Sequence, residues 1–193
     1  SVCRAFGKTC TGNESLALML GLDKWRAKAL FQHAGLLTPK GVEIMPGQPI
    51  PFKSLPTGPF IVKPVAADAS EGIDDHSIVQ QADEILEAAV RRIHTEFKQA
   101  ALVEQYVGER ELNVSLLQVG LDVRVLPLAE IDFSAFQDKP HIVSYAAKWL
   151  ADSFEYQHTP RLLPAPLPDE VAQTVREAAL GAWNALGCQD YAR

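Results

Sequence analysis

The sequence has few of the residues that mark secreted, membrane-spanning or disulfide-stapled proteins. Only three of its 193 residues are cysteines, and they form no CxxC pair. An odd number of scattered cysteines favours a reduced, cytoplasmic protein, with a Cys3–Cys10 disulfide as the less favoured alternative. No apolar run approaches the roughly 20 residues of a membrane span. The first residues also lack the apolar core of a signal peptide, so we expect neither a leader nor a membrane partner.

Common ligand-binding motifs are missing too. The five histidines are scattered and include no HExxH pair, and no GxxxxGK[ST] or GxGxxG run is present. These absences argue against the common zinc-protease, P-loop and dinucleotide-binding classes. A net charge of -6 argues against an extended nucleic-acid or anionic-membrane surface. It leaves room for a small anion site, because a few lysines can dominate locally.

What is present is an ordinary globular composition, with 47% hydrophobic and 22% charged residues. The length fits one large domain or two small lobes. Hydrophobic periodicity predicts helices over residues 13–20, 23–34, 80–98 and 168–186. It predicts strands over residues 38–44, 60–64, 101–107, 112–116 and 122–133. Strand pairs separated by single helices indicate an α+β fold and not a regular parallel βαβ series.

Local signals define the helix ends. We expect the first two helices to be broken at Gly21, with Asp23 as the N-cap of the second and Gly35 ending it. The apolar face of that helix is expected to consist of Trp25, Ala29, Leu30 and Ala34. The apolar face of the helix over residues 80–98 is expected to consist of Ile85, Leu86, Ala89, Val90, Ile93 and Phe97. Residues 65–77 and 134–166 are expected to be loops or irregular.

Three lysines lie where elements begin or end. Lys24 opens a helix, Lys63 closes the apolar strand 60–64, and Lys148 lies in the irregular segment. A lysine at the end of an apolar strand is costly if buried without a partner, and a phosphate group would satisfy it. The alternative for each lysine alone is that its side chain extends to the surface. The small residues of the 65–77 loop, including Ser70 and Gly72, would let backbone N–H groups approach such an anion.

Two carboxylates flank the end of the next strand. Glu104 lies within the apolar run 101–107, where it needs a hydrogen-bond donor, and Glu111 opens the following strand. Together they could accept hydrogen bonds from a base amine and from ribose hydroxyls. The alternative is an ordinary charge pair at a strand edge. Arg193 taken alone is an exposed C-terminal charge.

Taken together, these residues resemble the D-alanine–D-alanine ligases of the ATP-grasp superfamily. Six segments match in order and in register. They are residues 11–24 (YTGS…DK in the family), 34–39 (AGIPTP), 60–64 (VVKP), 103–111 (VEEFIxGRE), 145–149 (YEAKY) and 185–193 (ALGCxGYAR).

The resemblance implies an ATP-grasp fold with two lobes, each with helices and an antiparallel-rich sheet, that hold a nucleotide between them. It implies that residues 1–22 are the remnant of a preceding N-terminal domain and linker helix. Residues 23–108 would form the first ATP-grasp subdomain. Residues 109–193 would form the second, truncated at its C-terminal end.

The resemblance also implies roles for residues around the base and ribose. Glu104 would accept a hydrogen bond from the adenine amino group. Gln105, Tyr106 and Val107 would line the adenine slot, and Glu111 would bind the ribose hydroxyls.

On the phosphate side, Lys24 and Lys63 would hold the α- and β-phosphates, and Ser70 with its loop would cover the γ-phosphate. Lys148 would contact the terminal phosphate. Arg193 would stabilise the tetrahedral transition state, in which negative charge develops. Arg193 and Ser70 are therefore the candidate catalytic residues.

The implied activity is ATP-dependent joining of a carboxylate and an amine through an acyl phosphate, which makes a dipeptide for peptidoglycan. ATP and Mg²⁺ are the implied cofactors, with the metal ligands expected beyond residue 193. We therefore expect this chain alone to be inactive. Family members are often dimers, and the same is expected of a full-length parent.

Two departures from the family pattern leave the substrate open. The phosphate-loop pattern EGSSVG is replaced by residues 67–72, where Ala69 stands in place of the first serine. Trp149 replaces the tyrosine of YEAKY. In the family this serine and tyrosine belong to one hydrogen-bonded cluster near the substrate. The alternatives are therefore an ATP-grasp ligase for another amino acid or peptide, or a nucleotide-binding module without catalysis.

Overall fold

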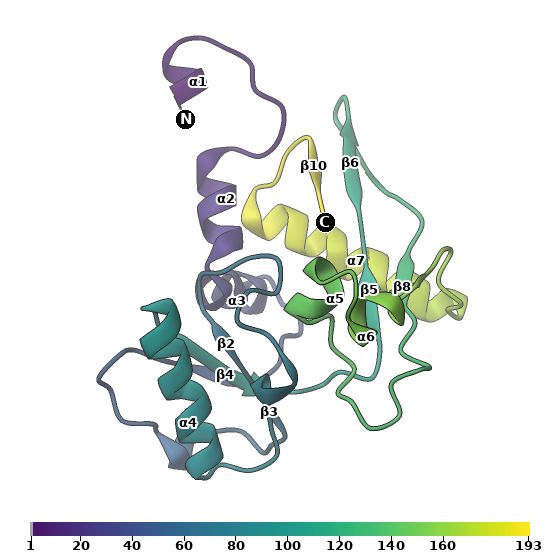
Figure 1. Cartoon of the computed structure of the whole chain (residues 1–193). Coiled ribbons are helices and arrows are strands. Elements are labelled where there is room, and N and C mark those ends of the chain that lie inside the picture. The colour runs from purple at the N-terminus through teal and green to yellow at the C-terminus, as the bar shows by residue number, and fades with distance from the viewer. Residues whose placement is uncertain (1) are drawn as a thin grey trace.

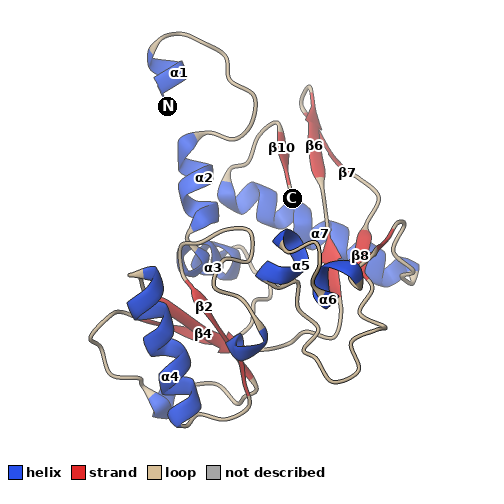
Figure 2. Cartoon of the chain, in the orientation of Figure 1, coloured by secondary structure: helices blue, strands red, loops and turns tan. Residues whose placement is uncertain are grey.

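The computed structural model describes residues 2–193, apart from the side chain of Arg4. A short helix α1 (Val2–Ala5) stands away from the rest of the chain at the end of a long loop (Figure 1). Two helices follow, α2 (Ser15–Leu22) and α3 (Lys24–His33). Figure 2 shows helices and short strands intermixed throughout the remainder of the chain, with long loops between them.

The first half of the chain is built on one antiparallel sheet in the order β1-β4-β2-β3. The strands are β1 (Gly41–Ile44), β2 (Phe60–Pro64), β3 (Ile78–Val79) and β4 (Ala101–Gln105). Helix α4 (Glu84–Arg92) covers one face of this sheet (Figure 1). Its buried positions Leu86, Ala89 and Val90, with Ile93 directly after its end, have helical spacing and pack on alternate residues of the strands. This is the largest apolar core of the described chain.

The opposite face of the same sheet is turned toward α3. There Trp25 packs on a small cluster of Val65, Ala100 and Leu102. Strand alternation places Lys63 and Glu104 on this face, because Val62 and Val103 point into the core under α4. The sheet therefore has one apolar face and one face with charged residues.

The second half contains two three-stranded antiparallel sheets. One consists of β5 (Glu111–Asn113), β8 (Ala129–Ile131) and β9 (Arg161–Leu162), and the other of β6 (Leu116–Val119), β7 (Asp122–Val125) and β10 (Tyr191–Ala192). Helices α5 (Tyr145–Trp149) and α6 (Phe154–Gln157) precede β9, and the long helix α7 (Asp169–Leu186) follows it. Every strand ladder is antiparallel, so the α+β prediction is confirmed.

Two helix predictions need correction. Helix α2 continues through Gly21 to Leu22, and the break comes at Asp23, whose extended backbone and side chain cap α3 through the Arg26 N–H. The face that α3 buries coincides with the predicted apolar face only in part, since Trp25 packs against the sheet. Ala27 and Lys28 are buried, whereas Ala29 and Ala34 are exposed. The face turned to the sheet carries lysines because it meets a carboxylate there.

Helix α4 is shorter than residues 80–98. It begins after Asp83, whose side chain accepts from the Ile85 N–H at 2.9 Å, and a π-helical turn (Ile93–Phe97) continues it. Ile85 is exposed, since it lies about 100° around the helix from Leu86.

Four of the five strand predictions were too long, whereas β2 has the predicted bounds 60–64. The segment 112–116 is divided between β5 and β6, which belong to different sheets, and the segment 122–133 is divided between β7 and β8. Pro127 lies in the second gap, where proline cannot donate a ladder hydrogen bond. β1 begins only after Pro39 and Lys40, and β4 ends at Gln105. The 134–166 segment, expected to be irregular, contains α5, α6 and β9.

The described chain has no helix that is long and apolar enough to cross a membrane. The thiols of Cys3, Cys10 and Cys188 are all free.

Candidate functional site

A cavity of about 410 Å³ lies between α3 and the charged face of the first sheet. Its polar lining consists of Lys24, Lys28, Lys63, Glu104 and Arg193. Lys24 and Lys28 are four residues apart, so the helix presents both on one face. Lys63 comes from the end of β2, and Glu104 from β4. The rigid elements on both sides hold these side chains in fixed positions.

Glu104 is the centre of the polar cluster. Only 6% of its surface is exposed, and each carboxylate oxygen meets one lysine. Oε1 pairs with Lys63, and Oε2 lies 2.8 Å from the Nζ atom of Lys28. Lys28 also donates to the Pro39 carbonyl. A buried carboxylate needs such partners, because an unpaired one would carry a large desolvation penalty.

Gly41 makes room for this cluster. It lies opposite Glu104 in the β1–β4 ladder, and a Cβ atom there would be 2.6 Å from the Glu104 Cβ. A larger residue would push Glu104 or β1 aside.

Lys24 lies at the mouth of the same cavity. Its Nζ atom donates to the Pro64 carbonyl at 3.0 Å and to the Ala67 carbonyl at 2.5 Å. Burial, together with repulsion from the nearby Lys63, lowers the pKa of Lys24 to about 8. A polyanion bound here would reverse that effect, since it favours the charged ammonium.

A second cavity, of about 450 Å³, is lined by residues of the second half and by Ala69 of the loop that follows β2. Glu111 and Asn113 enter it from the same face of β5, Lys148 from α5, and Arg161 and Arg193 from β9 and the C-terminal end. Burial raises the pKa of Glu111, and the Val143 N–H at 3.3 Å partly offsets this. Partial burial lowers the pKa of Lys148, which the charge of Glu111 opposes. Arg193 lines both cavities, so the two are neighbours.

The phosphate loop, as we name residues 66–77, connects β2 to β3 and contacts the second half of the chain beside these cavities. Ala69 and Ser70 both have positive φ, at 53° and 64°, which side chains rarely adopt. The Ser70 hydroxyl donates to the Val143 carbonyl at 2.6 Å. The Trp149 indole donates to the Ala69 carbonyl at 3.1 Å, and the Tyr145 N–H donates to the Ile73 carbonyl at 2.9 Å.

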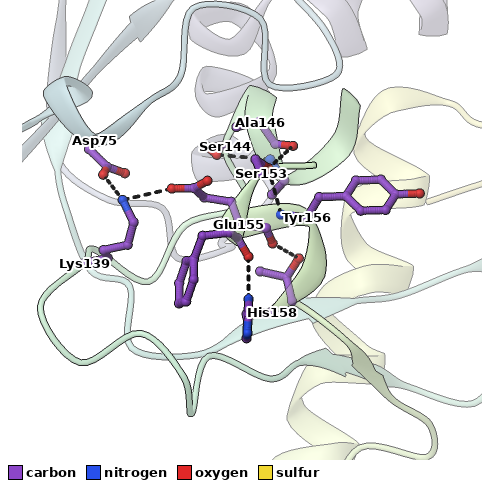
Figure 3. Close-up of polar contacts among 11 residues, drawn as sticks. Asp75, Lys139, Ser144, Ala146, Ser153, Glu155, Tyr156 and His158 are labelled. Carbon is purple, nitrogen blue, oxygen red and sulfur yellow. Dashed lines mark hydrogen bonds and ion pairs between the residues drawn. The ribbon is translucent and has the colours of Figure 1, made fainter. Parts of the chain in front are cut away.

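Ion pairs hold the C-terminal part of this loop, at Asp75 (Figure 3). Lys139 lies between Asp75 of the loop and Glu155 of α6, with its Nζ atom 2.9 Å from the Glu155 carboxylate. Around Glu155, Ser153 caps α6 through the Tyr156 N–H at 3.1 Å.

On the other side, Arg92 of α4 donates to Asp74 at 2.5 Å, to the Gly72 carbonyl at 3.1 Å and to Ser77 at 3.2 Å. The end of the loop is therefore bound on two sides.

The structure brings together most of the residues selected from the sequence. Lys24, Lys63 and Glu104 share the first cavity, and Glu111 and Lys148 share the second.

Three residues of the expected adenine slot lie elsewhere. Gln105 donates to the Thr57 carbonyl at 3.2 Å, on the strand face opposite to Glu104. Tyr106 and Val107 line a separate pocket beside Gly108. For these three residues, a nucleotide role stays a prediction.

Sequence reasoning missed three residues of the cavities. Lys28 could have been found from its spacing of four residues after Lys24 on the same helix. Asn113 could have been found from its spacing of two residues after Glu111 on a strand. No signal marked Arg161, because its segment had been interpreted as irregular.

Among the residues that the structure describes, no group of three or more His, Cys, Asp or Glu side chains could hold a metal ion.

Comparisons with known proteins identify the family. The family model for the D-ala D-ala ligase C-terminus matches residues 52–193. A D-alanine–D-alanine ligase of Nitrosospira multiformis is 32% identical over 184 residues, which cover 95% of this chain and 54% of the relative. An uncharacterised protein, y4sG, of Sinorhizobium fredii is 32% identical over 97% of the chain and 52% of its own length.

Solved structures agree on the fold. The D-alanine–D-alanine ligase of Bacillus anthracis, in complex with ATP, superposes with a TM-score of 0.74 at 22% identity, over 98% of this chain and 55% of that one. The VanG D-Ala:D-Ser ligase of Enterococcus faecalis gives a TM-score of 0.72 at 26% identity, over 96% and 50%. The ATP-grasp prediction is therefore confirmed.

This chain spans about half the length of the relatives it matches. Within that span, the family model covers most of the chain, including β2, β4, the second cavity and the C-terminal Arg193. Helix α3, which carries Lys24 and Lys28 of the first cavity, precedes the matched residues. The chain therefore belongs to the D-alanine–D-alanine ligase family, within the ATP-grasp fold.

Proposed function

We propose that this chain supplies the ATP-binding site of an ATP-dependent carboxylate–amine ligase that joins two D-alanine molecules for peptidoglycan in the cytoplasm. The observation that carries the proposal is the first cavity, where Lys24, Lys63 and Glu104 surround a space of about 410 Å³. Ammonium groups suit phosphate oxygens, and a carboxylate suits the adenine amino group. Two partly buried lysines beside one buried carboxylate thus suit the phosphate end and the adenine end of ATP.

The proposed chemistry has two steps. A carboxylate oxygen of the first amino acid attacks the γ-phosphorus of ATP, and ADP leaves. The amine of the second amino acid then attacks the acyl carbon of this acyl phosphate, loses a proton, and inorganic phosphate leaves. Lys24 and Lys63 would hold the phosphates of ATP, Lys148 would neutralise the terminal one, and Arg193 would stabilise the tetrahedral intermediate. Ser70 would help to cover the γ-phosphate.

Two parts of the proposal concern more than this chain. Mg²⁺ is proposed as the ion that accompanies ATP. A homodimer is proposed for a full-length protein that carries this chain.

A second candidate keeps the chemistry and changes the amino acid. The Trp149 indole donates to the backbone carbonyl of Ala69, whereas the family has a tyrosine and a serine side chain at these positions. Trp149 also lines the second cavity, beside Lys148 and Arg193. Its bulk favours a substrate that differs from D-alanine in shape. A relative described as a D-Ala:D-Ser ligase belongs to the same structural group.

Equilibrium binding of ATP to the chain tests the nucleotide claim. We expect binding by the unmodified chain and at least roughly tenfold weaker binding by Lys63→Ala, because it loses a charge-assisted contact to phosphate. The exposed Lys53→Ala is the matched control and should bind as the unmodified chain does. Equal binding by all three proteins would refute the site.

Phosphate release by a full-length protein that carries this chain tests the substrate. Release with D-alanine supports the first candidate. Release only with another amino acid supports the second.

A further inference from the structure

Lys28 has no role in the proposal so far, yet it is among the most deeply buried charged residues described. Its side chain is 8% exposed and lies in the wall of the first cavity. Its ammonium has two partners, the Glu104 carboxylate at 2.8 Å and the Pro39 carbonyl. A surface lysine would keep its charge in water, so this side chain is held inside by its contacts.

Glu104 is shared between two lysines that differ in freedom. Lys63 extends from the end of β2 and is 18% exposed, whereas Lys28 is fixed by two partners. In the proposed function Lys63 contacts phosphate, so its ammonium must turn from Oε1 of Glu104 toward the nucleotide. That movement frees Oε1 for the adenine amino group. Lys28 then remains as the one charge partner of a buried carboxylate.

We propose that Lys28 is a positioning residue for base recognition: it holds the Glu104 carboxylate in place and compensates its charge when Lys63 turns to the phosphates. This inference rests on the proposed function, since it needs ATP to occupy the cavity. Lys28 itself touches no part of the nucleotide in this arrangement. Its effect should therefore appear in the preference for the 6-amino group and not in the contacts to phosphate.

The test compares ATP with purine riboside 5′-triphosphate, which lacks only the 6-amino group, by equilibrium titration. The unmodified chain should prefer ATP by roughly tenfold or more, the effect of one charge-assisted hydrogen bond. Lys28→Met should reduce this preference to about twofold or less, mainly through weaker ATP binding. The variant should still fold, because Lys63 continues to pair with Glu104 in the absence of nucleotide.

The matched control is Lys53→Met, which removes an exposed lysine and should keep the full preference. If Lys28→Met does not fold, Lys28→Gln, which keeps a donor without the charge, replaces it. A uniform loss of affinity for both nucleotides would overturn the positioning role, since that is the result of general damage. An unmodified chain that binds ATP without preference for the amino group would overturn it as well. No binding of ATP by the unmodified chain would refute the proposed function, and this inference with it.

Discussion

The two sides of the candidate nucleotide site are built from opposite kinds of contact. On one side, Glu104 and Lys28 have side chains that are 7% and 8% exposed and pair with each other within the fold. On the other side, Asp75 and Lys139 of the phosphate-loop contacts are 42% and 30% exposed. The first side is a buried charge cluster on rigid elements. The second is a loop attached by exposed ion pairs and single hydrogen bonds.

This difference indicates how each side works. A buried charge that loses its partner is expensive, so the cluster keeps one arrangement until another charged group replaces a partner. Ala69 and Ser70 of the loop are each held by a single hydrogen bond, which contributes about 0.5–1.5 kcal/mol, so this part of the loop can separate from its contacts at little cost. We therefore expect a preformed site for the base and a loop that opens and closes over the phosphates.

Glu104→Ala should have the largest effect on folding stability. It leaves the ammonium groups of Lys28 and Lys63 facing each other without their shared anion, and removing one member of a buried ion pair costs about 3–5 kcal/mol. Urea denaturation measures the loss in unfolding free energy. Glu109→Ala, at an exposed position in the following loop, is the control and should change it by less than about 0.5 kcal/mol. A loss below about 1 kcal/mol would show that the cluster is solvated like the loop contacts.

Arg92→Met should have the next largest effect, because it frees the base of the phosphate loop. Arg92 is 23% exposed and donates to Asp74, to the Gly72 carbonyl and to Ser77. Hydrogen bonds to charged groups contribute about 1.5–3 kcal/mol, so we expect a loss near that range in urea denaturation. The exposed neighbour Arg91→Met on the same helix is the matched control. Equal stability of the two variants would mean that residues 72–77 of the loop are bound as loosely as residues 69 and 70.

Sequence patterns predicted the apolar part of this molecule better than the polar part. The stripe from Leu86 to Ile93 and the strand 60–64 were evident, because periodic burial leaves a periodic sequence. The buried face of α3 was mispredicted, since its lysines looked like a solvent-exposed face until the position of Glu104 was known. A lysine and a glutamate 76 residues apart in sequence carry no local signal of their pairing.

In the candidate site, too, residues with a local sequence signal were predicted and residues without one were not. Lys24, Lys63, Glu104 and Glu111 were selected because each interrupts an element or begins one. Arg161 was not selected, because a two-residue strand between prolines leaves no pattern to detect. The contact from Trp149 to Ala69 was also unforeseen, since a backbone carbonyl accepts it and any residue at position 69 supplies one.

The lowered pKa of Lys24 predicts that ATP affinity depends on pH, which tests the contact between Lys24 and the phosphates. Burial and the nearby Lys63 lower this pKa to about 8, so the ammonium is largely protonated at pH 7 and largely neutral at pH 9. A bound triphosphate favours the protonated form and raises the pKa, so ATP binding takes up a proton near pH 8 and above. ATP affinity should therefore fall with rising pH by up to about tenfold per unit above pH 8.

Titration calorimetry in buffers of different ionisation enthalpy measures this proton uptake directly. Lys24→Met is the control, and it should bind ATP more weakly with little proton uptake near pH 8.5. Affinity that stays constant between pH 7 and 9.5 in the unmodified chain would mean that Lys24 does not contact the phosphates.

Trp149→Phe should have the smallest effect on stability and should act only on the loop. It removes one indole donor at 3.1 Å from a ring that is 58% exposed, so we expect a loss of about 0.5 kcal/mol or less, at the low end for a hydrogen bond. Hydrogen exchange should then rise about twofold in the amides of residues 69–73 and stay unchanged in β4. Tyr145→Phe, on the same helix, is the control for aromatic packing. Faster exchange in β4 as well would contradict the division between a rigid charge cluster around Glu104 and a mobile loop. It would mean that loosening residues 69–73 also loosens the strand that carries Glu104.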